Sequence, residues 1–187
     1  MTRFGVVGTG YWARETHATA LAAHPEAELA GVWGRSLEKA TELAGTFGAR
    51  AYTDVDQMFD EVEAVAFAVP PDVQAGLAVR AAARGCHLLM DKPVAFTTAA
   101  ADEVVEAADR AGVRSLVFFT NRYCTDQAQW LAEVRQRTDW NAGHVRIYAS
   151  IFEPGNPFGE SEWRRQRGAL WDIGPTPCRS SCRRSDR

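Results

Sequence analysis

The sequence Asp91-Lys92-Pro93 follows the apolar run Cys86–Met90 and contains a side chain that can transfer a proton, Lys92. If the run is a buried strand of a parallel sheet, Lys92 stands at the strand's carboxyl end, where open α/β sheets bind ligands. A partly buried lysine there can take or give a substrate hydroxyl proton, and Asp91 can orient its ammonium group. An isolated lysine is more often a surface residue, so this interpretation depends on its surroundings.

A glycine-rich turn near the N-terminus gives the second chemical signal. The stretch Gly8–Ala13 reads G-x-G-x-x-A and directly follows a short apolar run. Gly8 permits a tight turn, Gly10 lets a pyrophosphate approach the backbone, and the helix that follows adds N–H groups and positive charge. We therefore expect dinucleotide binding; a glycine-rich turn that binds nothing is the alternative. The residues expected to hold the dinucleotide are Gly8, Thr9, Gly10, Tyr11 and Trp12.

The segment Val32–Ser36 indicates which dinucleotide is bound. A carboxylate at this place would bond the ribose hydroxyls of NAD, but the segment contains none. Arg35 can pair with a 2′-phosphate, Ser36 can donate a hydrogen bond, and Lys39 adds positive charge one turn later. The pattern favours NADP over NAD. The alternative is that Arg35 is a solvent-facing residue and Ser36 only a helix cap.

The elements around these residues alternate between strand and helix, which predicts a doubly wound parallel α/β sheet of the Rossmann type. Near Asn121 the pattern changes to one helix, 126–137, and one longer strand, 144–152, read as the start of a second α/β domain. The expected strands of the first domain are 3–7, 28–33, 50–52, 62–69, 86–90 and 113–119, and its helices are 11–23, 36–47, 55–59, 72–83 and 97–110.

Three motifs together resemble the Gfo/Idh/MocA family, the relatives of glucose–fructose oxidoreductase and inositol dehydrogenase. They are GTGYWA at 8–13, VPPDVQAGLAVRAAARGCHLLMDKPVA at 69–95 and WRRQRGALWDIG at 163–174. The family's usual E-K-P stands here as D-K-P. The resemblance implies an N-terminal Rossmann domain and a C-terminal domain whose open sheet covers the active site and forms oligomer contacts. We expect a Rossmann domain at 1–120, a partial substrate and oligomerisation domain at 121–174 and an aberrant basic tail at 175–187.

The resemblance also assigns roles to residues. Lys92 would position cofactor and substrate and assist proton transfer, and Asp172 would lie near the substrate hydroxyls. Trp163 as plain core packing is an equal alternative. The further expected contacts are Pro70, Pro71 and Asp91 on the cofactor side, and Arg122, Trp163 and Arg164 on the substrate side.

The resemblance stops after Gly174. The family continues D-x-G-x-H, whereas this chain has Asp172-Ile173-Gly174-Pro175-Thr176, so the histidine that would be the stronger general acid or base is absent. Restoring one base near codon 176 allows PHALSLLLPAIGP in place of PTPCRSSCRRSDR. We therefore hypothesise a frameshift, and expect a chain with little turnover whose strand at 144–152 has unpaired edges.

The composition limits the other classes of function. The net charge is −3 and the pI about 5.8, so the chain as a whole indicates no nucleic-acid partner. No apolar run approaches the roughly 20 residues of a membrane span. The four cysteines form no CxxC pair, so we expect no metal site, no disulfide framework and a cytoplasmic location.

The leading hypothesis is an NAD(P)-dependent oxidoreductase that moves hydride between nicotinamide and a hydroxyl or carbonyl carbon of a sugar, cyclitol or related compound. The second is a catalytically inactive dinucleotide-binding fragment. A third is a regulator whose basic tail contacts nucleic acid, since four arginines and one aspartate follow Gly174.

Overall fold

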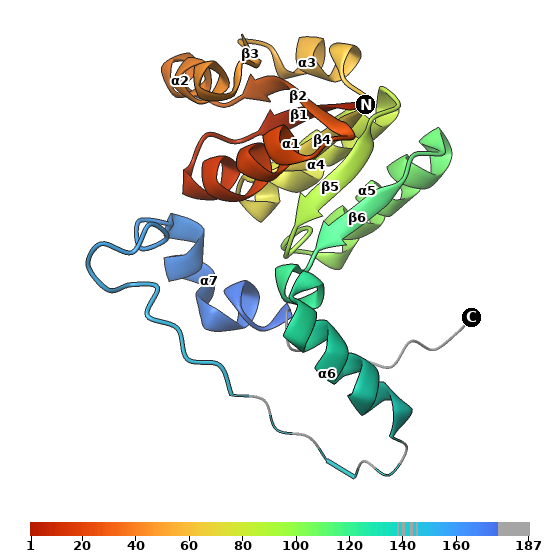
Figure 1. Ribbon diagram of the computed structural model, residues 1–187, viewed down its shortest axis with the longest axis vertical. Coiled ribbons are helices and arrows are strands. Elements are labelled where there is room, and N and C mark those ends of the chain that lie inside the picture. Colours follow the sequence, from red (N-terminus) through yellow and green to blue (C-terminus); the bar gives the residue numbers. More distant parts are fainter. Residues whose placement is uncertain (138, 140, 143, 145, 176–187) are drawn as a thin grey trace. The chain divides into compact units, whose positions relative to one another are not determined.

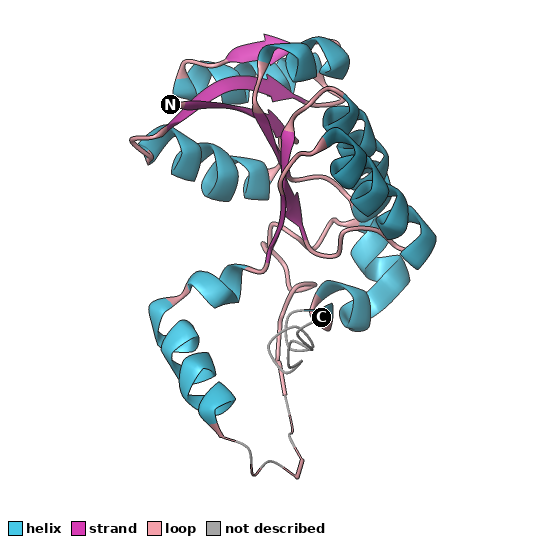
Figure 2. Ribbon diagram, turned by 90° about the vertical axis from the view of Figure 1, so that its right-hand side faces the viewer, coloured by secondary structure: helices cyan, strands magenta, loops and turns pink. Residues whose placement is uncertain are grey.

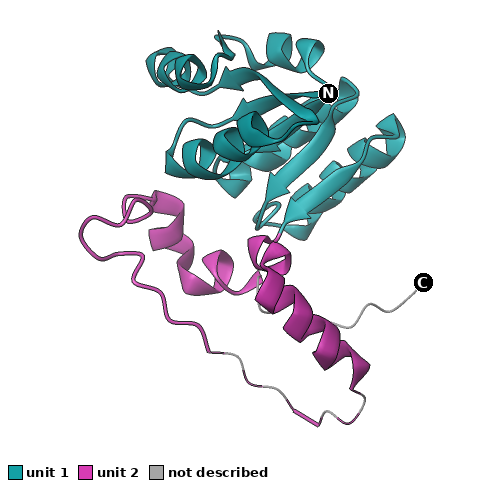
Figure 3. Cartoon of the chain, in the orientation of Figure 1, with its two compact units in different colours: residues 1–118 teal, residues 119–187 magenta. Residues whose placement is uncertain are grey.

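The computed structural model describes residues 1–137, 139, 141–142, 144 and 146–175. The chain divides into two compact units, Met1–Phe118 and Phe119–Arg187 (Figure 3). All but the first residue of the expected basic tail lies outside the described residues. The strands of the first unit are β1 (Thr2–Val7), β2 (Ala27–Trp33), β3 (Arg50–Tyr52), β4 (Ala64–Phe67), β5 (His87–Asp91) and β6 (Ser115–Phe118). Its helices are η1 (Ala13–Ala18), α1 (Thr19–Ala23), α2 (Leu37–Phe47), α3 (Val55–Glu61), α4 (Pro71–Ala83) and α5 (Thr98–Ala111).

The six strands form one parallel sheet in the order β3-β2-β1-β4-β5-β6 (Figure 1). The chain runs outward from β1 to β3 and then returns to the other side of β1 with β4, so the direction of winding reverses between β1 and β4. Open α/β sheets bind ligands at the carboxyl ends of their strands beside this reversal. The predicted doubly wound α/β fold is confirmed.

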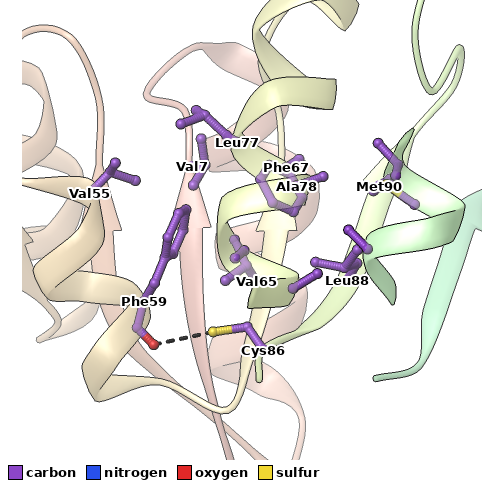
Figure 4. Packing of buried hydrophobic residues seen from close by; sticks show 14 of the residues in the cluster. Val7, Val55, Phe59, Val65, Phe67, Leu77, Ala78, Cys86, Leu88 and Met90 are labelled. Atoms are coloured by element: carbon purple, nitrogen blue, oxygen red, sulfur yellow. Dashed lines mark hydrogen bonds between the residues drawn. The ribbon is translucent and has the colours of Figure 1, made fainter. Parts of the chain in front are cut away.

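Helices cover both faces of the sheet (Figure 2) because side chains alternate along each strand. Val6 and Ala66 face a cluster formed with η1, α1 and α2. Val7 and Phe67 face a larger cluster formed with α3, α4 and α5 (Figure 4). All four side chains are fully buried. The burial of Val6, Val7 and Phe67 stabilises the fold by roughly 1.5–3 kcal/mol for each side chain.

The helix ends follow the local sequence signals. The Ser36 hydroxyl oxygen accepts a hydrogen bond from the Lys39 N–H at 3.4 Å and caps α2, as predicted. Gly48 ends the same helix with φ 70°, a conformation that glycine adopts without strain. Thr97 caps α5 by accepting from the Ala100 N–H at 3.2 Å. These short-range interactions fix where the connections between strands and helices begin and end.

The first helical segment differs in part from the prediction of one regular helix over 11–23. Its middle, Ala13–Ala18, is a π-helix, and α1 follows directly. The N–H and the hydroxyl of Thr19 both donate to the Arg14 carbonyl oxygen, five residues earlier. This wider turn lies directly after the glycine-rich segment, a placement typical of π-helical turns at functional sites.

The second unit contains η2 (Thr120–Tyr123), α6 (Thr125–Gln136) and α7 (Glu162–Asp172), which is interrupted at Gly168. The predicted helix at 126–137 is confirmed by α6. The predicted strand at 144–152 is wrong, because its described residues lie in no strand. A strand needs a hydrogen-bonding neighbour, and the described part of this unit offers no other strand. None of the described helices combines the length and the hydropathy that a membrane-spanning helix needs.

Candidate functional site

The glycine-rich turn joins β1 to η1 at the reversal of the sheet. The Gly8 N–H donates to the Trp33 carbonyl oxygen at 2.8 Å, and the Ala68 N–H donates to Val7 at 2.8 Å, so the turn is held between the ends of β2 and β4. Gly8 has φ 130°, and a Cβ there would collide with the Ala68 carbonyl oxygen. Only glycine fits this position.

Gly10 has a different role from Gly8. A Cβ on Gly10 would meet nothing within 4 Å, so the missing side chain leaves open space over the backbone. The Arg14 N–H donates to the Gly10 carbonyl oxygen at 3.1 Å, which places Gly10 at the start of the helical segment. An open backbone at a helix N-terminus fits a pyrophosphate group. Ala13 is fully buried, so the helix packs closely against the sheet.

The end of β2 meets the glycine-rich turn. A Cβ on Gly34 would lie 2.6 Å from Cγ2 of Thr9, so the two segments touch here. Arg35 and Lys39 are exposed and Ser36 is half-buried at the start of α2. In this geometry two cationic side chains and a hydroxyl follow the strand that neighbours the turn. The group is suited to an anionic substituent beside a bound pyrophosphate.

Gln74 on α4 organises the turn that carries Lys92. The Asp91 N–H donates to Gln74 Oε1 at 2.9 Å, and Gln74 Nε2 donates to the Asp91 carbonyl oxygen at 2.9 Å. The same Nε2 lies 3.2 Å from the Pro93 carbonyl oxygen and 3.1 Å from that of Val94. Gln74 is 1% exposed. The turn with Lys92 at its centre is therefore held from the protein interior.

His17 approaches the same turn from η1. Its Nε2 lies 3.6 Å from Oδ2 of Asp91, and its ring centre lies 5.8 Å from that of Phe118. His17 is buried, whereas the Asp91 side chain is 20% exposed. The contact joins the helical segment after the glycine-rich turn to the residue before Lys92.

The two prolines stand where β4 gives way to α4. Pro70 is the residue before the helix, and Pro71 is its first residue, a position where the missing N–H costs nothing. The Gln74 N–H donates to the Pro70 carbonyl oxygen at 2.9 Å. The prolines thus start the helix from which Gln74 reaches the Lys92 turn.

Three of the expected substrate residues of the second unit, Trp163, Arg164 and Asp172, lie together around the Arg164 guanidinium. Arg164 lies with Nε 3.1 Å from Oδ2 of Asp172, and its guanidinium stacks 4.6 Å from the Trp163 ring centre and 4.9 Å from that of Phe158. Arg164 Nε makes no aligned hydrogen bond among the described atoms, so the contact with Asp172 is an ion pair. Arg122 is half-buried in η2.

The thiol of Cys86 has a structural role. Cys86 is buried in the larger core cluster, where its thiol donates to the Phe59 carbonyl oxygen at 3.2 Å (Figure 4). Burial raises the pKa of this thiol to about 11, which keeps it protonated near neutrality. Within the described residues, no group of three or more histidine, cysteine or acidic side chains could hold a metal ion.

Sequence reasoning overlooked Gln74 and His17. Gln74 is a buried polar residue in a largely apolar helix, which is the one sequence signal that could have drawn attention to it. His17 stands among polar neighbours in Ala13–Ala18, so no such signal marks it. Their partners lie far away in the sequence, so the pattern alone does not show what they contact.

The strand order, the glycine-rich turn and the lysine turn define the class of the first unit, which is a dinucleotide-binding α/β domain. Residues 2–119 match the GFO_IDH_MocA family, described as an oxidoreductase family with an NAD-binding Rossmann fold. The chain belongs to this family, and is an oxidoreductase by lineage.

Several curated relatives match nearly the whole chain, and two of them are at least 33% identical to it and have a named activity. The dTDP-3,4-didehydro-2,6-dideoxy-alpha-D-glucose 3-reductase of Streptomyces violaceoruber is 34% identical over 95% of this chain and 52% of its own length. The NADP(+) scyllo-inositol 2-dehydrogenase IolU of Bacillus subtilis is 33% identical over 93% of this chain and 55% of its own. The chain therefore spans about half the length of these relatives.

A solved structure of a relative has a similar fold. The UDP-N-acetylglucosamine 3-dehydrogenase GnnA of Acidithiobacillus ferrooxidans is 31% identical, with a TM-score of 0.66. The match covers 71% of this chain and 43% of that one.

Proposed function

We propose that this chain forms the cofactor-binding half of an NADP-preferring oxidoreductase that acts on a hydroxyl or carbonyl carbon of a sugar or cyclitol. The observation that carries the proposal is the pair of turns at the carboxyl edge of the sheet. Gly10 leaves open space over a helix N-terminus, and Gln74 holds the turn around Lys92. The two turns follow β1 and β5, which lie on either side of β4.

The preference for NADP rests on the residues after β2. Gly34 touches Thr9 of the glycine-rich turn, which supports a role for the side chains that follow it at the adenosine ribose. Arg35 and Lys39 supply positive charge, and the Ser36 hydroxyl can donate to a phosphate oxygen. The described segment from Gly34 to Ser36 offers no carboxylate to repel a 2′-phosphate. One of the two relatives above also carries NADP(+) in its name.

Lys92 is the proposed proton-transfer group. The cofactor, when bound, supplies hydride exchange at its nicotinamide ring. In alcohol oxidation the neutral Lys92 amine takes the substrate hydroxyl proton as the C–H bond gives up its electron pair, and in ketone reduction the ammonium returns the proton to the forming alkoxide. Asp91 orients the ammonium group. Pro70 and Pro71 are proposed to border the ribose next to the nicotinamide.

The second unit is proposed to supply substrate contacts. Asp172 would accept hydrogen bonds from substrate hydroxyl groups, and Arg164 orients its carboxylate through the 3.1 Å ion pair. Arg122 and Trp163 are proposed to line the same substrate region. These roles rest on the family resemblance and on the Arg164–Asp172 pair.

Cofactor titration followed by a substrate screen tests the proposal. Binding of NADPH and NADH is followed by the tryptophan fluorescence of the whole chain, and turnover by the absorbance of reduced nicotinamide with sugars, nucleotide sugars and cyclitols. We expect NADPH to bind at least tenfold more tightly than NADH. Failure to bind either dinucleotide would overturn the proposal, and tighter binding of NADH would overturn the preference for NADP.

A second candidate is a dinucleotide-binding module without turnover. The observation that favours it is the state of the second unit, where Asp172 is 5% exposed and paired with Arg164, and where the described residues form no strand. Saturable NADPH binding with no turnover on any compound of the panel supports this candidate over the enzyme.

A further inference from the structure

Gln74 is a polar residue on the buried, otherwise apolar face of α4. The helix buries mainly alanine and leucine against the sheet, and Gln74 is the one long polar side chain among its buried residues. A buried amide without partners would destabilise the fold by about 1–3 kcal/mol. Both ends of the Gln74 amide are instead bonded to the backbone of one short segment, Asp91–Val94.

The arrangement of these bonds restricts the segment on both sides of Lys92. Before Lys92, the N–H and carbonyl groups of Asp91 are both bonded to the amide, each at 2.9 Å. After Lys92, the carbonyl oxygens of Pro93 and Val94 lie 3.2 and 3.1 Å from Nε2. Lys92 is the residue between these two attachment points, so its Cα position depends on a side chain that belongs to another element.

We propose that Gln74 is a positioning residue for Lys92. It sets the place and direction of the lysine side chain by fixing the backbone before and after it, without itself reaching the reacting atoms. Proton transfer depends on geometry within about half an ångström. Neither a shorter nor a purely apolar side chain can bond both halves of the turn, because the four contacts need one acceptor and one two-proton donor at the same distance from α4.

The surroundings of the Lys92 amino group can be measured directly by NMR, because Lys39 and Lys92 are the only lysines of the chain. Reductive methylation with ¹³C-formaldehyde labels their amino groups and keeps the charge. The NMR spectrum then contains two lysine signals besides that of the N-terminal amine, and Lys39→Arg assigns them. Lys39 is exposed on α2 and serves as the internal reference for every variant.

Gln74→Met keeps the side-chain volume and removes all four bonds, and Gln74→Glu keeps the acceptor for the Asp91 N–H but replaces the donor by an oxygen. We expect each variant to change the chemical shift or the titration midpoint of the Lys92 signal and to leave the Lys39 signal in place. Leu77→Ala is the matched control, because it removes a buried side chain from the same helix but no bond to the turn.

A general loosening of the fold would move the Lys92 signal in Leu77→Ala as much as in the Gln74 variants, and that result would overturn the proposal. An unchanged Lys92 signal in a folded Gln74→Glu or Gln74→Met protein would also overturn it. Where the variants do not fold, hydrogen exchange on the unaltered chain tests whether Gln74 holds the backbone at Asp91. We expect the Asp91 N–H to be as protected as its neighbours in β5, and rapid exchange of that group contradicts the bond to Gln74.

The catalytic meaning of this positioning role rests on the proposed function, but the NMR test does not require turnover. If the Lys92 signal responds to Gln74 and no substrate is converted, the positioning role stands and the enzymatic proposal fails. Where turnover is found, we expect Gln74→Met to lower kcat by at least tenfold with a small change in KM, and to shift the pH profile. An equal fall in kcat for Leu77→Ala would assign the loss to stability.

Discussion

His17 and Asp91 face each other across the boundary between η1 and β5, with Nε2 3.6 Å from Oδ2. The distance is too long for a good hydrogen bond, and the His17 Nε2 atom, which is buried, makes none among the described residues. A buried polar atom without a hydrogen bond costs about 1–3 kcal/mol. Groups of this kind are retained where they serve a site, and this one neighbours the residue before Lys92.

Replacing His17 by leucine should therefore not weaken the fold. The leucine fills a similar volume and removes the unsatisfied nitrogen, so we expect the free energy of unfolding to stay equal or to rise by up to about 1 kcal/mol. Urea unfolding followed by circular dichroism measures it. A loss of more than about 1 kcal/mol would show that His17 is an ordinary structural contact.

His87 supplies the matched control for this experiment. It lies at the start of β5, and its Nδ1 accepts a hydrogen bond from the Arg114 N–H at 3.1 Å. His87→Leu breaks a satisfied bond at an exposed site, and we expect it to cost about 1 kcal/mol. The two substitutions are chemically identical, so opposite effects on stability isolate the unsatisfied nitrogen of His17.

Alanine substitutions at the two glycines of the first turn should have different effects, one on stability and the other on cofactor affinity. Gly8→Ala places a Cβ against the Ala68 carbonyl oxygen in a backbone conformation with φ 130°, so we expect a loss of about 1–3 kcal/mol in the free energy of unfolding. Gly10→Ala meets open space, so its stability should change by less than about 0.5 kcal/mol while NADPH affinity falls at least tenfold. Urea unfolding and fluorescence titration measure the two effects. Unchanged cofactor affinity in Gly10→Ala would contradict the proposed pyrophosphate site.

Much of the first unit could be predicted because its signals are local. The helix start at Ser36 and the helix end at Gly48 each depend on residues within a few positions of one another, and the turn at Gly8 is marked by the short pattern G-x-G-x-x-A. The alternation of strands with helices then limited the possible topologies to a few.

The features that escaped prediction depend on distant partners. Gln74 and Asp91 are 17 positions apart, and no pattern in α4 indicates which backbone its glutamine bonds. The apolar stretch at 144–152 has the composition of a strand, but pairing is decided by a neighbouring strand rather than by the segment itself. Arg164 and Asp172 meet across the break in α7 at Gly168, where helical spacing no longer predicts which residues share a face.

Arg35 should discriminate between the two cofactors. A guanidinium group that pairs with a 2′-phosphate contributes only when that phosphate is present, so Arg35→Ala should weaken NADPH binding by about tenfold, or about 1.4 kcal/mol, and leave NADH unchanged. Fluorescence titration of both dinucleotides gives the ratio. Arg110→Ala, at an exposed position on α5, controls for the loss of a positive charge. Equal weakening of NADPH and NADH in Arg35→Ala would remove its role in selecting the cofactor.

Asp56 should make the free energy of unfolding depend on pH in the acid range. The Arg80 guanidinium lies 2.7 Å from one carboxylate oxygen and lowers the pKa of Asp56, with Arg84 3.0 Å from the other oxygen adding to the effect. Because the folded-state pKa lies below the ordinary value of 3.8, the stabilisation is complete above that value and is lost as the pH falls through the folded-state pKa. Asp56→Asn should therefore lower the free energy of unfolding by about 0.5–1 kcal/mol near pH 7.

The difference between Asp56→Asn and the unaltered chain should shrink toward zero as the pH falls through the folded-state pKa of Asp56, because the unaltered chain then loses the negative charge as well. Urea unfolding at a series of pH values follows it, with Asp102→Asn on α5 as a control for the loss of an exposed acid. A difference that stays constant from neutral to acid pH would mean that Asp56 stabilises the α3–α4 contact through packing or hydrogen-bond geometry, and that its ionisation is not linked to folding.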